Sequence, residues 1–158
     1  MGTVVFNSAK GRAIELHRNI ASNARPDAAF IVVLLQATEA DNVLKDYISL
    51  DDILTAIGNT EATFTNYLRQ ALTDTELVNP IVTDNIGDRN TITLPTVTIL
   101  AAGGALNNSL VKAIVCYTDD TTTAIDTTIE PIIAYDYVTT TDGNGLVIDF
   151  LSESFEAS

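Results

Sequence analysis

The first regular pattern along the chain is that of an amphipathic helix within residues 7–25. Its apolar face is formed, at helical spacing, by Ala9, Ala13, Ile14, Leu16, Ile20 and Ala21. Asn7 or Ser8 can accept hydrogen bonds from the free N–H groups at the start, and Gly11 weakens the first turn. Pro26 ends the helix, because a residue that precedes proline is disfavoured in the α region. The pattern predicts an N-terminal amphipathic helix over residues 7–25.

The next pattern is that of a buried strand. Residues 28–38, "AAFIVVLLQAT", form a β-branched apolar run. Its length and composition favour a central strand that is buried on both faces. Between residues 60 and 80 two patterns compete: alternation over residues 63–68 favours a strand, whereas residues 66–72, "NYLRQAL", could form a helix. We expect a strand there.

A short helix is expected between these two strand regions. Ser49 is a suitable N-cap, and the two acidic residues Asp51 and Asp52 would lie in the first turn, where they complement the helix dipole. Its apolar face would comprise Ile53, Leu54 and Ile57. Gly58 would end it.

The second half of the chain alternates short apolar runs with polar turns. Residues 85–88 resemble a hairpin turn between two β-rich runs, and Pro95 places a break or an edge after the second run. Further strands are expected at residues 110–117, 128–138 and 146–151, with a loop at 101–109 and a tight Asp-Gly/Asn-Gly turn at 139–145.

These elements predict a mostly β fold. We expect an antiparallel β-sandwich or a partly closed barrel, with the N-terminal amphipathic helix and one short additional helix packed on it. The length of 158 residues suits a single domain. Within that domain, residues 28–151 would form the β-rich body and residues 152–158 an acidic C-terminal tail.

Charge is distributed unevenly along the chain, whose net charge is −13. Half of its cations lie near the start, at Lys10, Arg12, Arg18 and Arg25. Nine acidic and no basic residues follow Lys112. A basic start and an acidic end are compatible with head-to-tail contact between copies, or with a charged partner, or simply with solubility.

The same charge balance disfavours two classes of partner. A nucleic-acid-binding protein needs cations for phosphates, and an anionic membrane surface attracts basic segments. We therefore expect neither partner. The longest apolar stretch, near residues 28–35, is far shorter than a membrane-spanning helix. The N-terminus has no charged region followed by an apolar core and a cleavage site, so no signal peptide is expected.

Nucleophilic catalysis would have to use Cys116 with His17, the single cysteine and the single histidine. Cys116 lies in an apolar run, which favours a buried, inert thiol. It has no second cysteine for an internal disulfide. His17 is expected on the surface of the basic helix or in a subunit contact. One Cys and one His also exclude an ordinary structural zinc site within one chain.

A cation site would have to use the connection that contains Asp119, Asp120 and Asp126. This connection has no glycine bend and no closing glutamate, so it fails the calcium-loop pattern and is expected to be a solvated link between strands. Residues 102–109, "AGGALNNS", lack the lysine of a phosphate-binding loop. They include a formal glycosylation sequon at 107–109. We therefore expect no catalytic residue, cofactor or metal site.

Four segments carry a further signal. They are "YLRQAL" at 67–72, "TDNIGDRNTITLP" at 83–95, "AAGGALNNSLVKAIVCYTDDTTTAIDTTIEPIIAYDY" at 101–137 and "TTTDGNGL" at 139–146. Together they resemble a family of small bacteriophage virion structural proteins, over about the last three-fifths of the chain. The shared motifs are Tyr-x-Arg, Asp-Asn-x-x-Asp-Arg, Gly-Gly-x-x-Asn-Asn, Ile-x-Pro and Thr-x-Asp-Gly. The start "FNSAKGRAIEL" is also similar, whereas the end "FLSESFEAS" departs from the apolar stop of many members.

The resemblance implies a non-enzymatic virion protein, assembled in the bacterial host cytoplasm, whose partners are other virion proteins and its own copies. A capsid decoration (cement) protein on the major capsid shell is the leading interpretation, with helix 7–25 and tail 152–158 as candidate contact elements. A tail, neck or baseplate component is the alternative. A glycan-binding β-domain using Tyr117, Tyr135 or Tyr137 is a third and less favoured one.

Overall fold

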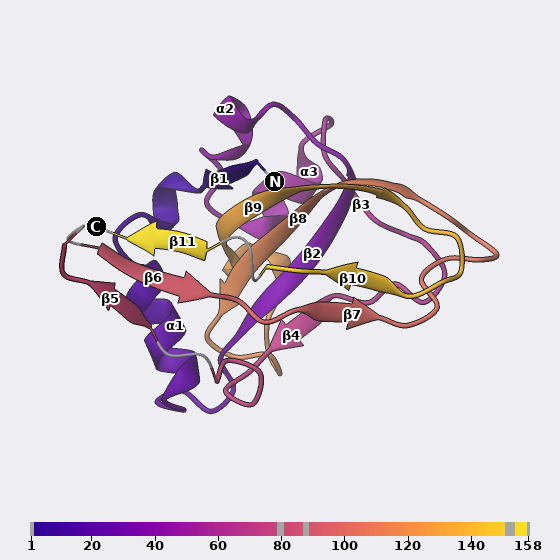
Figure 1. Cartoon of the computed structure of the whole chain (residues 1–158). Helices are drawn as coiled ribbons and strands as arrows, with labels where there is room; N and C mark the ends of the chain where they lie inside the picture. Colours follow the sequence, from indigo (N-terminus) through magenta and orange to yellow (C-terminus); the bar gives the residue numbers. More distant parts are fainter. Residues whose placement is uncertain (1, 79–80, 87–88, 151–153, 158) are drawn as a thin grey trace.

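The computed structural model describes residues 2–78, 81–86, 89–150 and 154–157, and these form three antiparallel sheets with a few short helices (Figure 1). The helices are α1 (Ala13–Ala21), α2 (Asp41–Leu44) and α3 (Leu50–Thr55), with 3-10 turns η1 (Asn7–Ala9) and η2 (Asp126–Thr128). The strands are β1 (Thr3–Val5), β2 (Ala29–Ala37), β3 (Thr60–Glu61), β4 (Gln70–Leu72), β5 (Val82–Asp84), β6 (Arg89–Thr93), β7 (Val97–Ile99), β8 (Ser109–Thr118), β9 (Glu130–Thr140), β10 (Leu146–Ile148) and β11 (Ser154–Ala157).

The central sheet is built on the two longest strands, β8 and β9, and on β2. Its strand order is β1-β9-β8-β2-β3, and β4 also pairs with β2. Every residue of β2 from Ala29 to Leu35 is buried, which confirms the central strand expected at 28–38. The strands expected at 110–117 and 128–138 are likewise confirmed by β8 and β9.

Both faces of the central sheet are covered. The cross-strand partners Phe30 and Tyr117 make an edge-to-face contact on the side that carries α1, where His17 also contacts Phe30. The two small sheets, β11-β6-β5 and β10-β7, lie on that side as well (Figure 1), with Tyr135 of β9 packed on Phe150. Lys112, which points to the other face, bonds to Asp41 of α2. The mostly β, antiparallel, sandwich-like prediction is confirmed, and over the described ranges no sheet closes into a barrel.

The predicted bounds of the N-terminal helix, 7–25, were wrong. Residues 7–9 form the 3-10 turn η1, and the α-helix covers only Ala13–Ala21. Gly11, with φ of +79°, adopts a left-handed conformation that separates the two. Asn23, with φ of +53°, turns the chain before Pro26 is reached. The predicted apolar face is correct at Ala9, Ala13, Leu16 and Ile20, which are buried, whereas Ile14 is only partly buried and Ala21 is exposed.

The short helix near Ser49 is confirmed as α3. The Ser49 Oγ accepts a hydrogen bond from the Asp52 N–H at 3.1 Å, and the Asp52 carboxylate accepts one from the Ser49 N–H at 3.1 Å. The helix ends at Thr55, so Ile57 is fully exposed and was wrongly placed on the apolar face. One helix was predicted besides the N-terminal helix, but the described residues contain two, because the single-turn helix α2 precedes α3.

The strand expected between residues 60 and 80, with its alternation over 63–68, was wrong: this segment holds only the two short strands β3 and β4. β3 and β4 pair with different parts of β2, and residues 62–69 form a loop between them. The turn at 139–145 also differs from a hairpin turn. It leads from β9 in the central sheet to β10, which pairs with β7. The chain changes layers there, so its two flanking strands are not hydrogen-bonded neighbours.

The acidic end of the chain is part of the β structure rather than a separate tail. Residues 154–157 form β11, which pairs antiparallel with β6, Phe155 opposite Ile92. Residues 151–153 and 158 lie outside the described residues. The β5–β6 hairpin is confirmed, with Asp84 opposite Arg89, and positions 87–88 of its turn also lie outside the described part. None of the helices in the described ranges is long and apolar enough to cross a membrane.

Candidate functional site

Three loops meet at one end of the molecule, opposite α1 and β11 in Figure 1. They are residues 62–68 before β4, residues 100–108 between β7 and β8, and residues 141–145 between β9 and β10; we call them the tip. The loop expected at 101–109 is thus confirmed. The Gly-Gly-x-x-Asn-Asn and Thr-x-Asp-Gly motifs, which lie apart in the sequence, come together here.

Asn108 joins all three loops of the tip. Its Oδ1 accepts a hydrogen bond from the Thr63 N–H at 2.6 Å. Its own N–H donates to the Thr141 Oγ1 at 2.9 Å, and its carbonyl oxygen accepts from the Thr141 N–H at 3.0 Å. Asn108 and Thr141 are both buried. Sequence reasoning missed this role, and the only signal for it was the Asn pair at the end of a Gly-rich loop.

Thr65 ties the first loop to the second. The Thr65 N–H donates to the Leu106 carbonyl at 3.0 Å, and the Thr65 carbonyl accepts from the Gly103 N–H at 2.9 Å. The Thr65 Oγ1 also accepts from the Leu106 N–H at 3.0 Å. Backbone groups that would otherwise need water are therefore satisfied within the tip, which makes these loops a fixed surface.

Two glycines allow the loops to approach so closely. Gly103 has φ of +95°, and a Cβ at that position would lie 2.8 Å from the Oγ1 of Thr141 in the third loop. Gly143 has φ of +94°, and a Cβ there would lie 3.3 Å from the Gly104 Cα. Larger residues would therefore separate the second and third loops.

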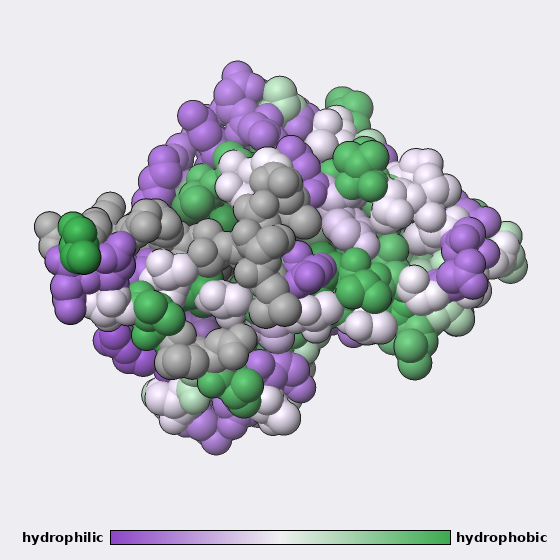
Figure 2. All heavy atoms as spheres, in the orientation of Figure 1, coloured by the Kyte–Doolittle hydropathy of each residue, from purple (hydrophilic) through white to green (hydrophobic). Residues whose placement is uncertain are grey.

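The tip exposes apolar side chains and almost no charge. Leu68, Leu100 and Leu106 are 72%, 78% and 51% exposed. Figure 2 shows apolar side chains gathered over β7 and β10, beside a polar cap at the far end. Asp142 is the only charged residue in 62–68, 97–111 and 138–148, although the whole chain has 21 acidic and 8 basic residues. Exposed apolar surface with little charge is typical of protein contact surfaces.

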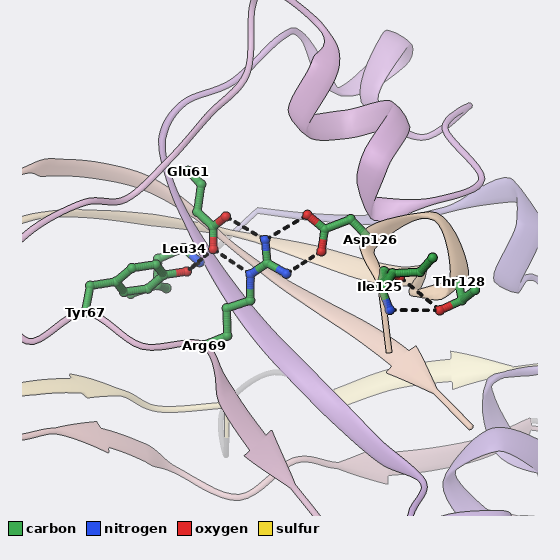
Figure 3. A network of polar contacts seen from close by, with 7 residues as sticks. All are labelled: Leu34, Glu61, Tyr67, Arg69, Ile125, Asp126 and Thr128. Carbon is green, nitrogen blue, oxygen red and sulfur yellow. Dashed lines mark hydrogen bonds and ion pairs between the residues drawn. The ribbon is translucent and has the colours of Figure 1, made fainter. Parts of the chain in front are cut away.

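Arg69 anchors the first loop at its base (Figure 3). Its guanidinium donates to both oxygens of Glu61, at 2.7 Å each, and to both oxygens of Asp126, at 2.5 and 3.1 Å. The Tyr67 hydroxyl donates to Glu61 at 2.8 Å and accepts from the Leu34 N–H at 3.1 Å. The hydrogen bonds that Arg69 donates to Glu61 and Asp126 raise the pKa of its guanidinium, so the charge is permanent. A planar guanidinium fits two carboxylates in this way.

The three carboxylates weighed as a cation site are held apart by different partners. Asp126 is bound by Arg69, so the connection at 119–128 is not simply solvated. Asp119 accepts from the Tyr117 hydroxyl at 2.6 Å and pairs with Arg25 at 3.0 Å. Across the described ranges, no three His, Cys, Asp or Glu side chains gather as metal ligands would.

Asp120 serves the turn in which it lies. Its carboxylate accepts from the N–H and hydroxyl of Thr122, at 2.7 and 2.6 Å, and from the hydroxyl of Thr123 at 2.8 Å. These hydrogen bonds, those of Thr122 first, lower the pKa of Asp120 to about 2. The abundant threonines of this connection therefore have a local structural use.

Cys116 and His17 do not form a catalytic pair. Cys116 is fully buried, and its burial raises the pKa of the thiol well above its ordinary value, as expected for an inert group. It stands one position from Tyr117 on β8, so its side chain points to the opposite face of the sheet from α1 and His17.

The surface placement expected for His17 was wrong. The ring is buried, and within the described structure neither ring nitrogen has a hydrogen-bond partner. Burial lowers the pKa of His17. A surface pocket of about 450 Å³ lies beside α1 and is lined by His17, Leu77 and Ile81, among other residues. The His17 nitrogens are covered, so they offer no hydrogen bond to an occupant of this pocket.

The tyrosines considered for glycan binding do not form a stacking surface. Tyr117 and Tyr135 are buried. Tyr137 is partly buried, and its hydroxyl donates to the Val147 carbonyl at 2.7 Å, which links the central sheet to β10. A sugar ring needs an exposed aromatic face, which the first two do not offer.

Two of the four cations of the basic N-terminal segment, Arg12 and Arg25, are paired with carboxylates of the same chain. Arg12 bonds to both oxygens of Glu130 at 2.8 and 3.0 Å, and Arg25 pairs with Asp119. The basic helix therefore presents less free charge than its sequence suggests.

Lys112 of β8 is buried between Asp136 and Asp41. Although burial of Lys112 opposes its charge, hydrogen bonds to both carboxylates outweigh that effect and raise its pKa.

Comparisons with known proteins add no relative: no protein-family model, no curated protein and no solved structure matches the chain.

Proposed function

We propose that this chain is a structural protein of a bacteriophage virion, and that it decorates the capsid by binding and stabilising the major capsid shell. The observation that carries the proposal is the tip. Two of the motifs that resemble the virion family build a hydrogen-bonded end with exposed leucines and a single charge. A surface of this kind suits binding to another protein better than it suits chemistry on a small molecule.

The remaining polar groups support a structural role. The Asp126 carboxylate and the Arg69 guanidinium stabilise the loops. The Cys116 thiol is buried in the central sheet with a raised pKa. Each of these groups therefore has a use within the fold, which supports a structural rather than a catalytic role.

The physical basis for decoration is repetition. One small apolar contact is weak, but a protein that binds at every equivalent position of a symmetric shell gains from neighbouring contacts. A tip that is already ordered loses little conformational freedom on binding. The tip, rather than the basic helix 7–25, is therefore the surface that we assign to contact with virion partners.

The experiment is quantitative mass spectrometry of purified particles of the phage that encodes the chain. The proposal predicts its peptides in the particles, with a copy number on the order of hundreds, as expected for a shell lattice. A copy number of about six or twelve would instead indicate a neck, tail or baseplate ring. Particles without the chain would contradict both assignments.

A further inference from the structure

We propose that Asn144 in the tip is a site of spontaneous covalent modification, at which a side-chain amide is slowly converted to a carboxylate. Asparagine is one of the thermally labile residues of proteins. Asn144 is the one asparagine of the sequence that a glycine follows, at Gly145. Both residues are exposed, in the loop between β9 and β10. The sequence pattern and the exposure therefore coincide at this position.

The reaction is an attack of the Gly145 backbone nitrogen on Cγ, the side-chain carbonyl carbon of Asn144. The bond between that nitrogen and Cγ forms, and the bond between Cγ and Nδ2 breaks. Nδ2 leaves as ammonia with the proton that the backbone nitrogen gives up, and a five-membered succinimide ring remains. Water then opens the ring at either carbonyl and leaves aspartate or isoaspartate at position 144. Water is the one co-reactant, and no group is oxidised or reduced.

The loop leaves the reacting atoms accessible. Gly145 has no Cβ to obstruct the approach of its nitrogen to Cγ. Among the described residues, its N–H takes part in none of the backbone hydrogen bonds of the loops. Those bonds engage its neighbours: the Gly143 N–H donates to the Ala102 carbonyl at 2.9 Å, and the Ala102 N–H donates to the Asn144 carbonyl at 2.8 Å. The fold therefore orders the loop without occupying the nitrogen that must react.

Asn108, in the same tip, shows the opposite arrangement. It is also followed by a small residue, Ser109, but it is buried. Its Oδ1 accepts from the Thr63 N–H at 2.6 Å, and its Nδ2 donates to the Asn107 carbonyl at 3.1 Å. Ser109 is already the first residue of β8. The fold therefore protects the amide of Asn108, which makes this residue an internal control.

Conversion of Asn144 would change the tip. Its N–H donates to the Asp142 Oδ1 at 3.0 Å and its Nδ2 to the Asp142 Oδ2 at 2.9 Å. These bonds, the backbone one first, lower the pKa of Asp142. Conversion replaces the donor Nδ2 by an oxygen that only accepts, and places a second negative charge beside the first. In isoaspartate the carbonyl that accepts from the Ala102 N–H also leaves the main chain, so the third loop loses a bond to the second.

For a virion protein, the modification is a slow and irreversible weakening of the tip contact. This consequence rests on the proposed function, because it requires a partner at the tip. The reaction itself does not, because it requires only the folded chain and water.

The test is incubation of the purified, folded chain over weeks at mildly acidic and at mildly alkaline pH, followed by mass spectrometry of the peptide that contains position 144. Digestion at acid pH, where the reaction is slow, keeps sample preparation from producing it. We expect this peptide to gain one dalton and to separate into two products. The rate should rise with hydroxide concentration, because the attacking nitrogen must lose its proton. The Asn108 amide should persist in the folded chain.

Gly145→Ala should slow the reaction at least tenfold, because the new Cβ obstructs the attacking nitrogen. The fold accommodates it, since φ of Gly145 lies outside the left-handed region and the nearest atom to the new Cβ is the Ile99 carbonyl oxygen at 4.0 Å. Should this variant melt at a lower temperature than the wild type, Asn144→Gln provides the comparison, because its longer side chain must close a larger ring. Asn144→Asp installs the charge directly and should melt below Asn144→Gln.

Three results would overturn the inference. They are an Asn144 amide that persists in the folded chain while the chain unfolded in urea loses it, loss at Asn108 as fast as at Asn144, and Gly145→Ala and Asn144→Gln variants that lose the amide as fast as the wild type. Purified particles without the chain would overturn the proposed function and leave the modification standing. Particles that contain the chain, with an Asn144 amide that survives incubation, would overturn the modification alone.

Discussion

Arg69 and Asp126 join two connections that are 57 residues apart in the sequence, through hydrogen bonds of 2.5 and 3.1 Å. The same guanidinium holds Glu61 at the start of the first tip loop. The base of the tip is therefore fixed to the connection between β8 and β9. An ion pair of this kind positions the loop as well as stabilising it.

Arg69→Met should destabilise the protein by about 2 kcal/mol, because it leaves the Glu61 and Asp126 carboxylates facing each other without a cation. The side chains involved are only partly buried, which keeps the loss below that of a fully buried pair. Urea denaturation of the two proteins measures the difference.

Arg12→Gln is the matched control. Arg12 also pairs with a carboxylate, since its Nη1 donates to both oxygens of Glu130, but its side chain is half exposed, so its loss should cost less than about 1 kcal/mol. Equal losses in the two variants would show that Arg69 is an ordinary surface residue.

Gly143→Ala should destabilise the tip. The left-handed conformation costs an L-residue about 1–2 kcal/mol, and the new Cβ would also press on the Gly104 backbone. Gly11→Ala is the control, because Gly11 has a similar φ of +79° but open space around its Cβ position. Thermal unfolding should show the larger drop in melting temperature for Gly143→Ala. The same drop in both variants would mean that the close approach of the loops is unimportant.

Local patterns were sufficient to predict the long strands β2, β8 and β9 and the capped helix α3, because these depend on neighbours in the sequence. The apolar run of β2 and the Ser49 cap are examples. The burial of His17 could have been found, since it follows Ala13 by four residues on the apolar face of α1. Its polar side chain directed the prediction to the surface instead.

Other features depend on contacts between distant segments, which periodicity does not encode. The pairing of β11 with β6 was missed because the acidic composition of residues 152–158 indicated a solvated tail. The role of Asn108 depends on Thr63 and Thr141, which belong to separate loops. The ion pairs of Arg12 and Arg25 with carboxylates of the same chain likewise join segments that are distant in the sequence.

Acidification should destabilise the protein through His17. Because burial lowers its folded-state pKa, the unfolded chain binds a proton more readily than the folded one. Stability from this group is therefore complete above its unfolded pKa, about 6.5, and falls as the pH drops below it. His17→Leu should flatten the slope of unfolding free energy against pH between about 6.5 and 5.

Carboxylates do not obscure that window. The folded-state pKa values of Glu76 and Asp120 are lowered. The stability that these two carboxylates contribute is therefore lost only as the pH falls to about 4, their unfolded pKa, and below. Urea denaturation at a series of pH values checks the prediction. An unchanged slope in His17→Leu would mean that His17 binds a proton as readily in the folded protein as in the unfolded chain.

Cys116 should not react with a thiol reagent in the folded protein, because the thiol is fully buried and its pKa is raised. Labelling with a disulfide reagent should become complete only as urea unfolds the chain. Ile57→Cys is the control and should show one reactive thiol per folded chain, since position 57 is fully exposed. Rapid labelling of Cys116 in the folded wild type would reopen a catalytic or redox role for it.

The central claim is that the tip is the contact surface of a virion protein. A cryo-EM map of the phage particle tests it most directly, because a map shows both the position of the chain and the surface that it buries. We expect many copies on the capsid shell, with Leu100 and Leu106 buried in contacts. A map in which the chain is present but its tip faces solvent, or in which the chain is missing from the particle, would contradict the claim.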